Sequence, residues 1–418
     1  METKYDALVI GGGVIGLCTA WHLARAGART AVVDKSDFSD GTSRVNAGLL
    51  VPSHIEPIAA PGVIAQGIKW MADPESPFYI KPRVDANLTR WLWAFRAACT
   101  RENVERAVPI LRDLALAAMD LFDDMAALPG FEDIGFAHTG LLMVHNSEKS
   151  ERANLELADL ADEAGVDVRR LSGSEALELE PAIRTPMHGA VFFRQDALFD
   201  PERFMDALYA DVLRRGVRIF PETTVSDFET EDGRVTGVRT DGETIRASNF
   251  VLAAGAWSAA LGKKLGLRLS VEPATGYSIT VENPQSALRI PVIVTDQKVT
   301  VTPMPGRLRF GGTLTLVGFS TKIDMRRVRP LERQARLYCP ELDAGEGSLP
   351  APRSGFRPCT TDGLPVIGRP ERWPNVVVAA GHGMLGMTEG PITGSLAADL
   401  VAGREPEMDI SALSPDRF

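Results

Sequence analysis

Residues 5–16 read YDALVIGGGVIG, an apolar run that leads directly into closely spaced glycines. A helical pattern continues to Ala26 and ends at Gly27, and a second apolar run over residues 30–33 is followed by Asp34. Strand, helix and strand in this order form a βαβ unit that carries the GxGxxG pattern in the context it requires. These residues predict a Rossmann-type fold with a dinucleotide site at the glycine turn.

Each glycine of the pattern has its own physical role. Gly11 makes the tight turn, Gly13 lets the backbone approach a pyrophosphate, and Gly16 lets the helix pack closely against the strand. Val14 and Ile15 open the helix, whose free N–H groups and positive dipole end face the phosphates. A purely structural glycine-rich turn would not account for the helix and the acid that follow in register.

Two downstream features bear on which dinucleotide is bound. Asp34 is placed to accept hydrogen bonds from ribose hydroxyls, and an acid there disfavours the 2′-phosphate of NADP. Residues 41–48 are small and polar, which lets the backbone run beside a large planar ligand. These residues by themselves leave NAD and FAD both open.

The middle of the chain carries segments that point to a family. Residues 222–254 read as a short hairpin and a strand, with Thr223-Thr224-Val225 near the start and VLAAGAWS following from Val251. Here the chain resembles the FAD-dependent amino-acid oxidoreductases of the D-amino-acid oxidase superfamily. In that family a segment like VLAAGAWS returns to the cofactor and a strand like TTV lies beside the adenine, so the resemblance implies FAD.

The C-terminal quarter carries the same resemblance. Ser354–Gly368, SGFRPCTTDGLPVIG, is similar to the family's carboxylate-binding segment. Val376–Gly403 is similar to its closing strand, glycine-rich turn and helix. The helix, expected from about Met387 to Val401, aims its N-terminus at the flavin, where a positive dipole end stabilises the reduced ring at its N1/O2 edge.

The glycine turn and the resemblance together imply an FAD site. The residues expected to bind FAD are Gly11, Gly13, Val14, Ile15, Gly16, Asp34, Lys35, Ser43, Asn46, Ala47, Gly48, Leu49, Val225, Ala253, Ala254, Gly255, Trp257, Gly383, Met384, Leu385, Gly386, Met387 and Thr388. Some flavoproteins of this superfamily hold FAD through a cysteine thioether, but Cys359 is displaced from that position, so non-covalent FAD is expected. No cysteine spacing of the metal-binding type is present.

Residues 46–100 narrow the resemblance. Ala60–Val63, Ile68–Met71 and Arg90–Trp93 are the points at which this stretch is similar to bacterial D-amino-acid dehydrogenases of the small-subunit type. That likeness implies an enzyme of amino-acid catabolism, which deaminates D-amino acids oxidatively to 2-oxo acids by hydride transfer from the α-carbon to flavin N5. Electrons would then pass to a quinone or another acceptor.

Two other functions remain open. The first is oxidation of a cyclic or secondary amino acid, such as D-proline, hydroxy-D-proline, glycine or sarcosine. The second is a non-catalytic FAD subunit that only transfers electrons. The intact Gly355–Pro358 segment argues against the second, because such a subunit has no use for a carboxylate anchor.

Oxidation of an amino acid by hydride transfer needs an anchor for the substrate more than a strong acid or base. Arginine grips a carboxylate at two points, and the resemblance places that arginine at Arg357. Tyr277, on a strand expected to face the flavin, is a candidate to assist Arg357 or line the pocket. His54 and Glu56 are candidates to contact the substrate amine, although a solvent-facing loop is favoured for both. For His382 a structural role is favoured.

The FAD-binding elements are separated along the sequence, which is typical of an interleaved architecture. We expect an α/β fold, with a Rossmann-type FAD-binding domain interleaved with an α+β substrate domain on a mixed or antiparallel sheet, as in D-amino-acid oxidase. The FAD-binding domain is assigned residues 1–85, 195–266 and 351–418, and the substrate domain residues 86–194 and 267–350. Ser172 and Glu175 form a capping box that predicts a helix start.

The 418-residue chain is long enough for two domains, and its net charge of −10 with scattered basic residues argues against nucleic-acid binding. The expected partner is a small-molecule amino-acid substrate. No signal peptide and no apolar stretch of ~18 residues is visible, and the four widely spaced cysteines favour free thiols in a reducing compartment. A cytoplasmic location is expected, with peripheral contact with the inner membrane, oligomeric state and natural acceptor left open.

Overall fold

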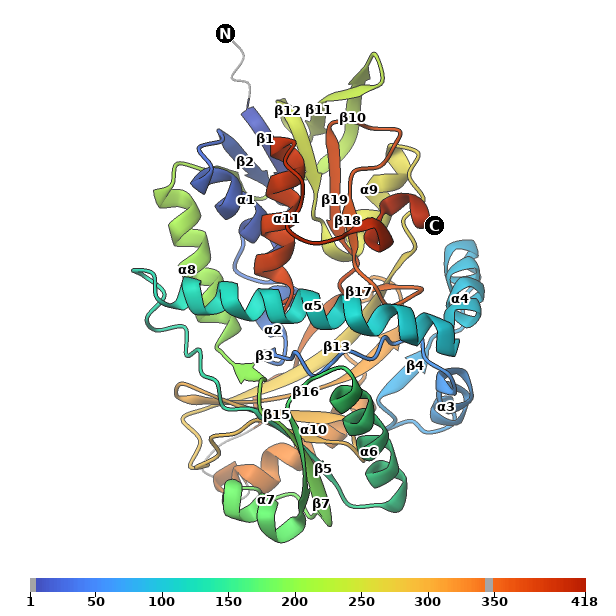
Figure 1. Ribbon diagram of the computed structural model, residues 1–418, viewed down its shortest axis with the longest axis vertical. Coiled ribbons are helices and arrows are strands. Elements are labelled where there is room, and N and C mark those ends of the chain that lie inside the picture. Colours follow the sequence, from blue (N-terminus) through green and yellow to red (C-terminus); the bar gives the residue numbers. More distant parts are fainter. Residues whose placement is uncertain (1–4, 343–348) are drawn as a thin grey trace.

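The molecule consists of two halves, each built on a sheet, with a long helix between them (Figure 1). The computed structural model describes residues 5–342 and 349–418. In the upper half, β1 (Tyr5–Ile10) lies parallel to both β2 (Thr30–Val33) and β12 (Thr244–Leu252). These parallel strands are buried, which is why they are nearly continuous apolar runs.

Strands and a helix from the end of the chain complete the upper half. β19 (Val376–Ala380) pairs in parallel with β12, and α1 (Val14–Arg25) packs against α11 (Gly390–Ala402). A Cβ at Gly394 would come within 2.6 Å of the Cys18 backbone, so glycine there lets the two helices approach closely. The remaining strands of this sheet are β9 (Arg218–Phe220), β10 (Val225–Glu231), β11 (Arg234–Thr240) and β18 (Val366–Gly368).

The lower half is built on a mixed sheet. β13 (Val271–Glu282) pairs antiparallel with β16 (Arg307–Leu316) and β17 (Arg353–Thr360), whereas β14 (Val292–Val294) pairs parallel with β5 (Leu141–His145). Its other strands are β4 (Phe78–Ile80), β6 (Val168–Ser172), β7 (Gly189–Phe193) and β15 (Val299–Met304). The predicted fold class, a Rossmann-type half with a second half on a mixed sheet, is confirmed.

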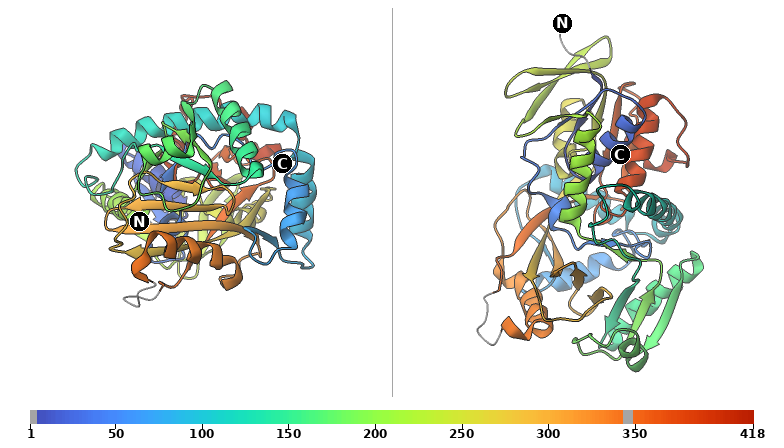
Figure 2. Two further views of the ribbon diagram at one scale, coloured as in Figure 1. Left: turned by 90° about the horizontal axis from the view of Figure 1, so that it is seen from below. Right: turned by 90° about the vertical axis from the view of Figure 1, so that its left-hand side faces the viewer.

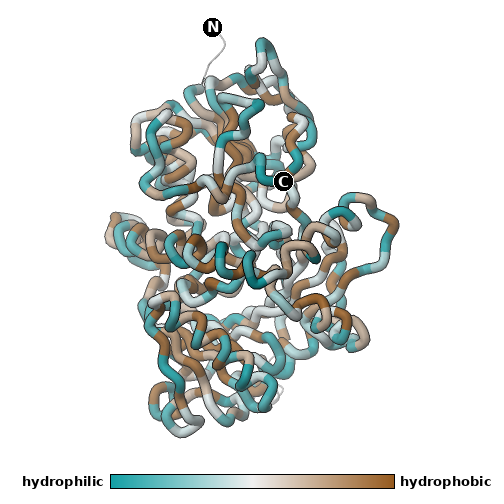
Figure 3. The backbone as a smooth tube through the Cα atoms, turned by 45° about the vertical axis from the view of Figure 1, so that its right-hand side comes forward, coloured by the Kyte–Doolittle hydropathy of each residue, from teal (hydrophilic) through white to brown (hydrophobic). Residues whose placement is uncertain are grey.

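Helix α5 (Arg101–Ala126) runs between the two halves, as the right-hand view of Figure 2 shows. A short ribbon of β3 (Leu49–Leu50) and β8 (Ala197–Leu198) lies near the same level. Figure 3 shows hydrophobic and hydrophilic residues alternating along the outer helices, as expected for helices with one buried face. The other helices are α2 (Thr42–Val45), α3 (Val63–Met71), α4 (Ala86–Ala98), α6 (Glu148–Glu163), α7 (Gly173–Leu179), α8 (Pro201–Arg214), α9 (Ser258–Lys264) and α10 (Met325–Tyr338), with 3₁₀ turns at Gly255–Trp257, Pro340–Leu342, Ser411–Leu413 and Pro415–Arg417.

One predicted helix start is confirmed, and another lies later in the chain than expected. Ser172 and Glu175 bond each other's backbone N–H groups at the start of α7, which confirms the capping box. The helix expected from about Met387 begins instead at Gly390. Pro391 in its first turn explains this start, because proline favours the first helical positions, and residues 386–389 form turns.

The chain crosses between the two sheets several times, as the order of the strands along the sequence shows. β17 pairs with β13 in the lower sheet, while the strands that follow it return to the upper one. The exact domain boundaries stay a prediction. Within residues 5–342 and 349–418, no helix combines the length and the apolar character needed to cross a membrane.

Candidate active site

The glycines at the end of β1 differ in what surrounds them. Gly11 has φ +113°, and a Cβ there would come within 2.4 Å of the Ala253 carbonyl oxygen. A Cβ at Gly16 would lie 1.8 Å from the Gly11 carbonyl oxygen. Gly13 is different, because the nearest atom to its Cβ would be the Ser43 hydroxyl oxygen at 3.3 Å. Gly11 and Gly16 are thus required by packing, while Gly13 leaves open space in front of the helix.

The open turn is edged by polar groups of fixed orientation. Asp34 accepts hydrogen bonds from the backbone N–H of Gly12 at 2.6 Å and from the hydroxyl of Ser36 at 2.8 Å. The N–H of Val14, in the first turn of α1, donates to the hydroxyl of Ser43 at 3.0 Å. A helix N-terminus, a carboxylate and a hydroxyl therefore surround the space that a pyrophosphate and ribose would fill.

One cavity of about 1700 Å³ extends from this turn into the lower half. Pockets for single small ligands are typically ~300–1,000 Å³, so this cavity has room for a dinucleotide and a substrate together. Of the residues expected to bind FAD, those that line it are Gly11, Gly13, Val14, Ile15, Asp34, Lys35, Ser43, Asn46, Ala47, Val225, Ala253, Ala254, Gly255, Trp257, Gly383, Met384, Gly386 and Met387. The turn and the size of the cavity fit FAD.

Five residues expected to touch the cofactor do not line this cavity: Gly16, Gly48, Leu49, Leu385 and Thr388. The position of Gly48 is a matter of packing, because a Cβ there would come within 2.7 Å of the Phe199 carbonyl oxygen. Thr388 uses its hydroxyl to accept the N–H of Val51 at 3.2 Å. These residues support the cavity wall from behind.

Lys35 and Trp257 both line the cavity, and their side chains are in contact with each other. The Lys35 ammonium lies 3.4 Å from the centre of the Trp257 ring, a cation–π contact, and burial lowers its pKa. Trp257 is also stacked on Phe319, with ring centres 5.0 Å apart. The pair forms a rigid part of the wall.

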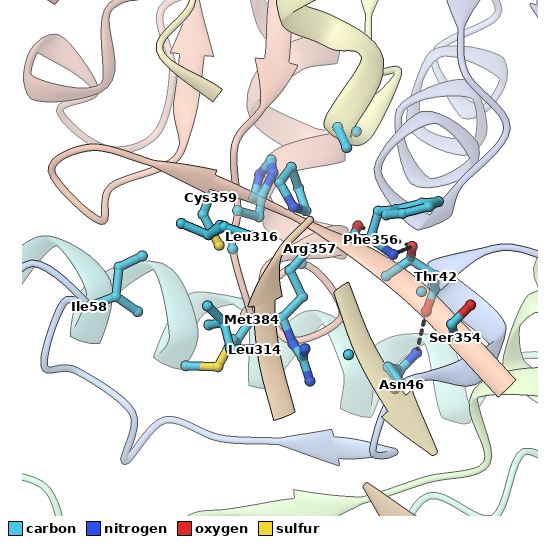
Figure 4. A pocket seen from close by; sticks show the side chains of 18 of the residues that line it. Thr42, Asn46, Ile58, Leu314, Leu316, Ser354, Phe356, Arg357, Cys359 and Met384 are labelled. Atoms are coloured by element: carbon cyan, nitrogen blue, oxygen red, sulfur yellow. Dashed lines mark hydrogen bonds between the residues drawn. The ribbon is translucent and has the colours of Figure 1, made fainter. Parts of the chain in front are cut away.

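Arg357 projects from β17 into the same cavity. Its Nη1 donates to the carbonyl oxygen of Thr313 at 2.8 Å, and within the described residues no carboxylate forms an ion pair with it. In the view of Figure 4 its guanidinium lies between Leu314 and Met384 on one side and Asn46 on the other. Burial lowers its pKa. The side chain is half-buried. A cation held partly out of water without a counter-charge is costly, so this guanidinium calls for an anionic ligand.

The neighbouring strands are shaped around Arg357. A Cβ at Gly276 would lie 2.0 Å from Nη1 of Arg357, so only glycine leaves room for the guanidinium. The pairing of β13 with β16 shifts register between Thr275 and Tyr277, and Thr313, opposite this shift, has φ +65°. This irregularity lies where the Thr313 carbonyl meets Arg357. Sequence reasoning missed both residues, although a glycine inside a strand signals a close approach.

The variant Gly276→Ala tests this arrangement. Its methyl group displaces the guanidinium, and we expect the dissociation constant of the substrate to rise at least about 10-fold, while FAD content stays that of the wild type. Anaerobic titration of the flavin spectrum measures both. In the Arg357→Met background the same change should have almost no further effect on binding, because the free-energy effects of substitutions at two residues in contact do not add. An equal loss of affinity in both backgrounds would contradict the role of Gly276.

The other catalytic candidates have mixed outcomes. Tyr277 lines the cavity and packs in the lower core; its hydroxyl accepts the N–H of Asp324 at 3.3 Å, and the only hydrogen bond from Arg357 within the described residues goes to Thr313. The solvent-facing position favoured for His54 is wrong: the side chain is half-buried and lines the cavity. Glu56 is exposed but also lines it.

His382 and Cys359 also line the cavity. His382 is buried with Nε2 3.0 Å from the Thr393 hydroxyl, and burial lowers its pKa to about 3, as befits the structural role favoured for it. Cys359 is 1% exposed, and burial raises its pKa to about 12. A thiol held neutral in this way is a poor nucleophile.

An open dinucleotide turn and an uncompensated arginine, joined by one cavity, define an enzyme that uses a dinucleotide to act on an organic anion. The chain matches the family described as FAD dependent oxidoreductase over residues 6–400, and it belongs to that family. FAD is therefore its cofactor, and the resemblance found in the sequence is confirmed.

Individual relatives align with nearly the whole chain. It is 34% identical to a D-amino acid dehydrogenase of Methylobacterium nodulans, over 98% of both proteins. It is 33% identical to a D-amino acid dehydrogenase of Bradyrhizobium diazoefficiens, again over 98% of both. Among solved structures, glycine oxidase from Geobacillus kaustophilus superposes with a TM-score of 0.78 at 27% identity, covering 99% of both chains.

Proposed function

We propose that this protein oxidises D-amino acids to 2-oxo acids and ammonia, with FAD as the hydride acceptor. The observation that carries the proposal is the uncompensated Arg357 guanidinium in the cavity that begins at the glycine turn. A substrate carboxylate would supply the missing negative charge, and the planar guanidinium would fix its orientation. The D-amino acid dehydrogenases that align over the full chain support this choice of substrate.

Some residues of the site would bind the dinucleotide and the substrate, and others would exclude water. Gly13, the start of α1 and Asp34 would hold the dinucleotide, and bound FAD supplies the acceptor for two electrons and a hydride. Arg357 would anchor the carboxylate. Leu314 and Met384 lie together on one side of it in Figure 4 and would exclude water from the reacting carbon.

In the proposed enzyme FAD is held without a covalent bond, since the Cys359 thiol stays neutral. Acid precipitation should therefore release all flavin into the supernatant.

Electrons would leave the reduced enzyme for a quinone or another carrier rather than mainly for oxygen. The enzyme is cytoplasmic, in keeping with its cysteines, which are free thiols.

The test is anaerobic mixing of the FAD-loaded protein with single amino acids. D-alanine should bleach the oxidised flavin absorbance and yield pyruvate and ammonia, whereas L-alanine should leave the absorbance unchanged. Glycine, sarcosine and D-proline serve as comparisons, and a rate on any of them far above that on D-alanine would move the substrate to that class. Bleaching by L- but not D-amino acids would refute the proposal.

A further inference from the structure

A chain of hydrogen bonds leads from the cavity wall to a buried acid, Asp196. Asp196 is 0% exposed. One carboxylate oxygen accepts the backbone N–H of Ser53 at 3.0 Å, and the other accepts the Ser53 hydroxyl at 2.6 Å. The same hydroxyl oxygen lies 3.1 Å from Nδ1 of His54. His54, Ser53 and Asp196 thus form a continuous line from the cavity wall to the interior.

The arrangement determines which nitrogen of His54 is free. A serine hydroxyl has one hydrogen, and in this chain Ser53 donates it to the Asp196 carboxylate. The Ser53 oxygen must then accept a hydrogen from Nδ1 of His54. In the neutral ring Nε2 therefore carries the lone pair, and it makes no hydrogen bond with the described residues. Nε2 is the base of this group.

The backbone holds the three residues in place from both sides. Ser53 follows β3 and Asp196 precedes β8, and these two strands pair with each other. The Asp196 carbonyl oxygen also accepts the N–H of Gly140 at 2.9 Å. His54 lines the large cavity together with Arg357, and it lines a small adjoining cavity beside Met384. His54 therefore lies on the wall of the same cavity that Arg357 lines.

The proposed reaction requires no strong base, but the substrate nitrogen must lose one proton before a hydride can leave. A D-amino acid arrives as the ammonium form, which has no nitrogen lone pair, and a hydride can leave the α-carbon only as that lone pair forms the C=N bond. We propose that His54, Ser53 and Asp196 form a proton relay that removes the ammonium proton of the bound amino acid. This inference rests on the proposed function and adds to it the groups that prepare the substrate for oxidation.

Each proton transfer in the relay balances. The N–H bond of the ammonium breaks and an H–Nε2 bond forms on His54. The Nδ1 hydrogen passes to the Ser53 oxygen, and the Ser53 hydrogen passes to Asp196. The result is a neutral amine, a neutral imidazole, an intact serine and a neutral carboxylic acid, so one proton has moved and no electrons have. The proton returns to water by the reverse path after the product leaves.

The surroundings favour Asp196 as the final position of the proton. Burial raises the pKa of Asp196 to about 7, and the Ser53 hydrogen bonds only partly offset this. Burial and the charge of Lys298 lower the pKa of His54 to about 4, so a lasting imidazolium is disfavoured. The other titratable groups near His54 are Glu56, on its own segment, and His382, which shares the small cavity.

The experiment measures the anaerobic rate of flavin reduction by D-alanine across the pH range. The relay accepts a proton only when Asp196 is ionised, so the wild-type rate should fall as pH decreases through about 7. Asp196→Asn keeps the shape but cannot accept the proton, and we expect the limiting rate to fall roughly 10²- to 10⁴-fold, the inflection to disappear and substrate affinity to change less than about threefold. Ser53→Ala interrupts the same path and should behave alike.

Two controls separate a relay from a merely structural role. Glu180 is also buried, but it binds the backbone N–H groups of Arg289 and Ile290 and does not line the cavity, so Glu180→Gln should keep the wild-type rate and inflection. Nitrogen-15 NMR of labelled histidine should show the His54 hydrogen on Nδ1 in the wild type. In Ser53→Ala this preference for Nδ1 should disappear. This readout does not depend on turnover.

The outcomes distinguish this inference from the function on which it rests. If wild-type flavin is bleached by D-alanine but Asp196→Asn keeps both rate and inflection, the relay is wrong and the proposed function stands. A hydrogen on Nε2 of His54 in the neutral wild-type protein would also overturn the relay. If no amino acid bleaches the wild-type flavin, the function and the relay fail together.

Discussion

Replacing Arg357 by methionine should raise the dissociation constant of a D-amino acid about 100- to 4000-fold while leaving FAD content unchanged. The substrate carboxylate would then be buried without its partner. Breaking a buried ion pair by removing one member costs roughly 3–5 kcal/mol, and each 1.4 kcal/mol is about tenfold in affinity. Arg357→Lys keeps the charge but loses the planar fork, so an intermediate loss is expected.

The measurement is an anaerobic titration of the flavin spectrum with D-alanine, or with a non-reacting carboxylate of similar size. Arg170→Met is a matched control, since Arg170 stands in the same sheet but is partly exposed and paired with Asp159 and Asp162. It should bind substrate as the wild type does. Wild-type affinity in Arg357→Met would mean that the carboxylate is bound elsewhere, and the proposed function would lose its main support.

Replacing Gly13 by valine should give a folded protein that is almost free of FAD. Gly13 has φ −73°, and only the Ser43 hydroxyl oxygen lies within 4 Å of the added Cβ, at 3.3 Å, so a Cβ there requires only a small shift of the Ser43 side chain. Replacing a glycine N-cap by an aliphatic residue costs less than about 1 kcal/mol of helix stability. The added carbons occupy the space of the pyrophosphate, and we expect FAD affinity to fall on the order of 100-fold or more, about 3 kcal/mol.

Visible absorbance of the purified protein and titration of the apoprotein with FAD measure this loss, and circular dichroism verifies the fold. The matched control is Gly242→Val, at a turn where a Cβ would meet only the Thr240 hydroxyl, at 3.8 Å. It should retain FAD. Gly11→Val would be less informative, since its Cβ would clash with the Ala253 carbonyl and unfold the turn. A yellow Gly13→Val protein with normal affinity would place the pyrophosphate elsewhere.

The parts of the site that could be predicted are those with a local signature. The spacing of Gly11, Gly13 and Gly16 and the acid that ends β2 are set by one βαβ unit, so short-range reasoning was enough. The position of Arg357 came from a resemblance carried by a continuous segment. In each case residues near in sequence determine the feature.

The parts that sequence reasoning missed depend on contacts between distant segments. Ser53 and Asp196 are 143 positions apart, and neither stands in a pattern that indicates its partner. The shape around Gly276 depends on how β13 slips against β16, which no period of apolar residues determines. The half-buried position of His54 on the cavity wall has the same origin, because a loop residue gives no signal of the distant segments that pack around it.

The interleaved path of the chain also has a consequence for biosynthesis. β19 lies beside β12 and α11 packs on α1, so the half that begins with the first residues is completed only by the last ones. A nascent chain emerging from the ribosome can form the glycine turn early, but the sheet and the helix layer around it close only after about residue 402 is free. Cofactor loading is therefore expected to wait until residues up to about 402 have been synthesised, and chains that stop before α11 should be colourless and be removed by chaperones and proteases.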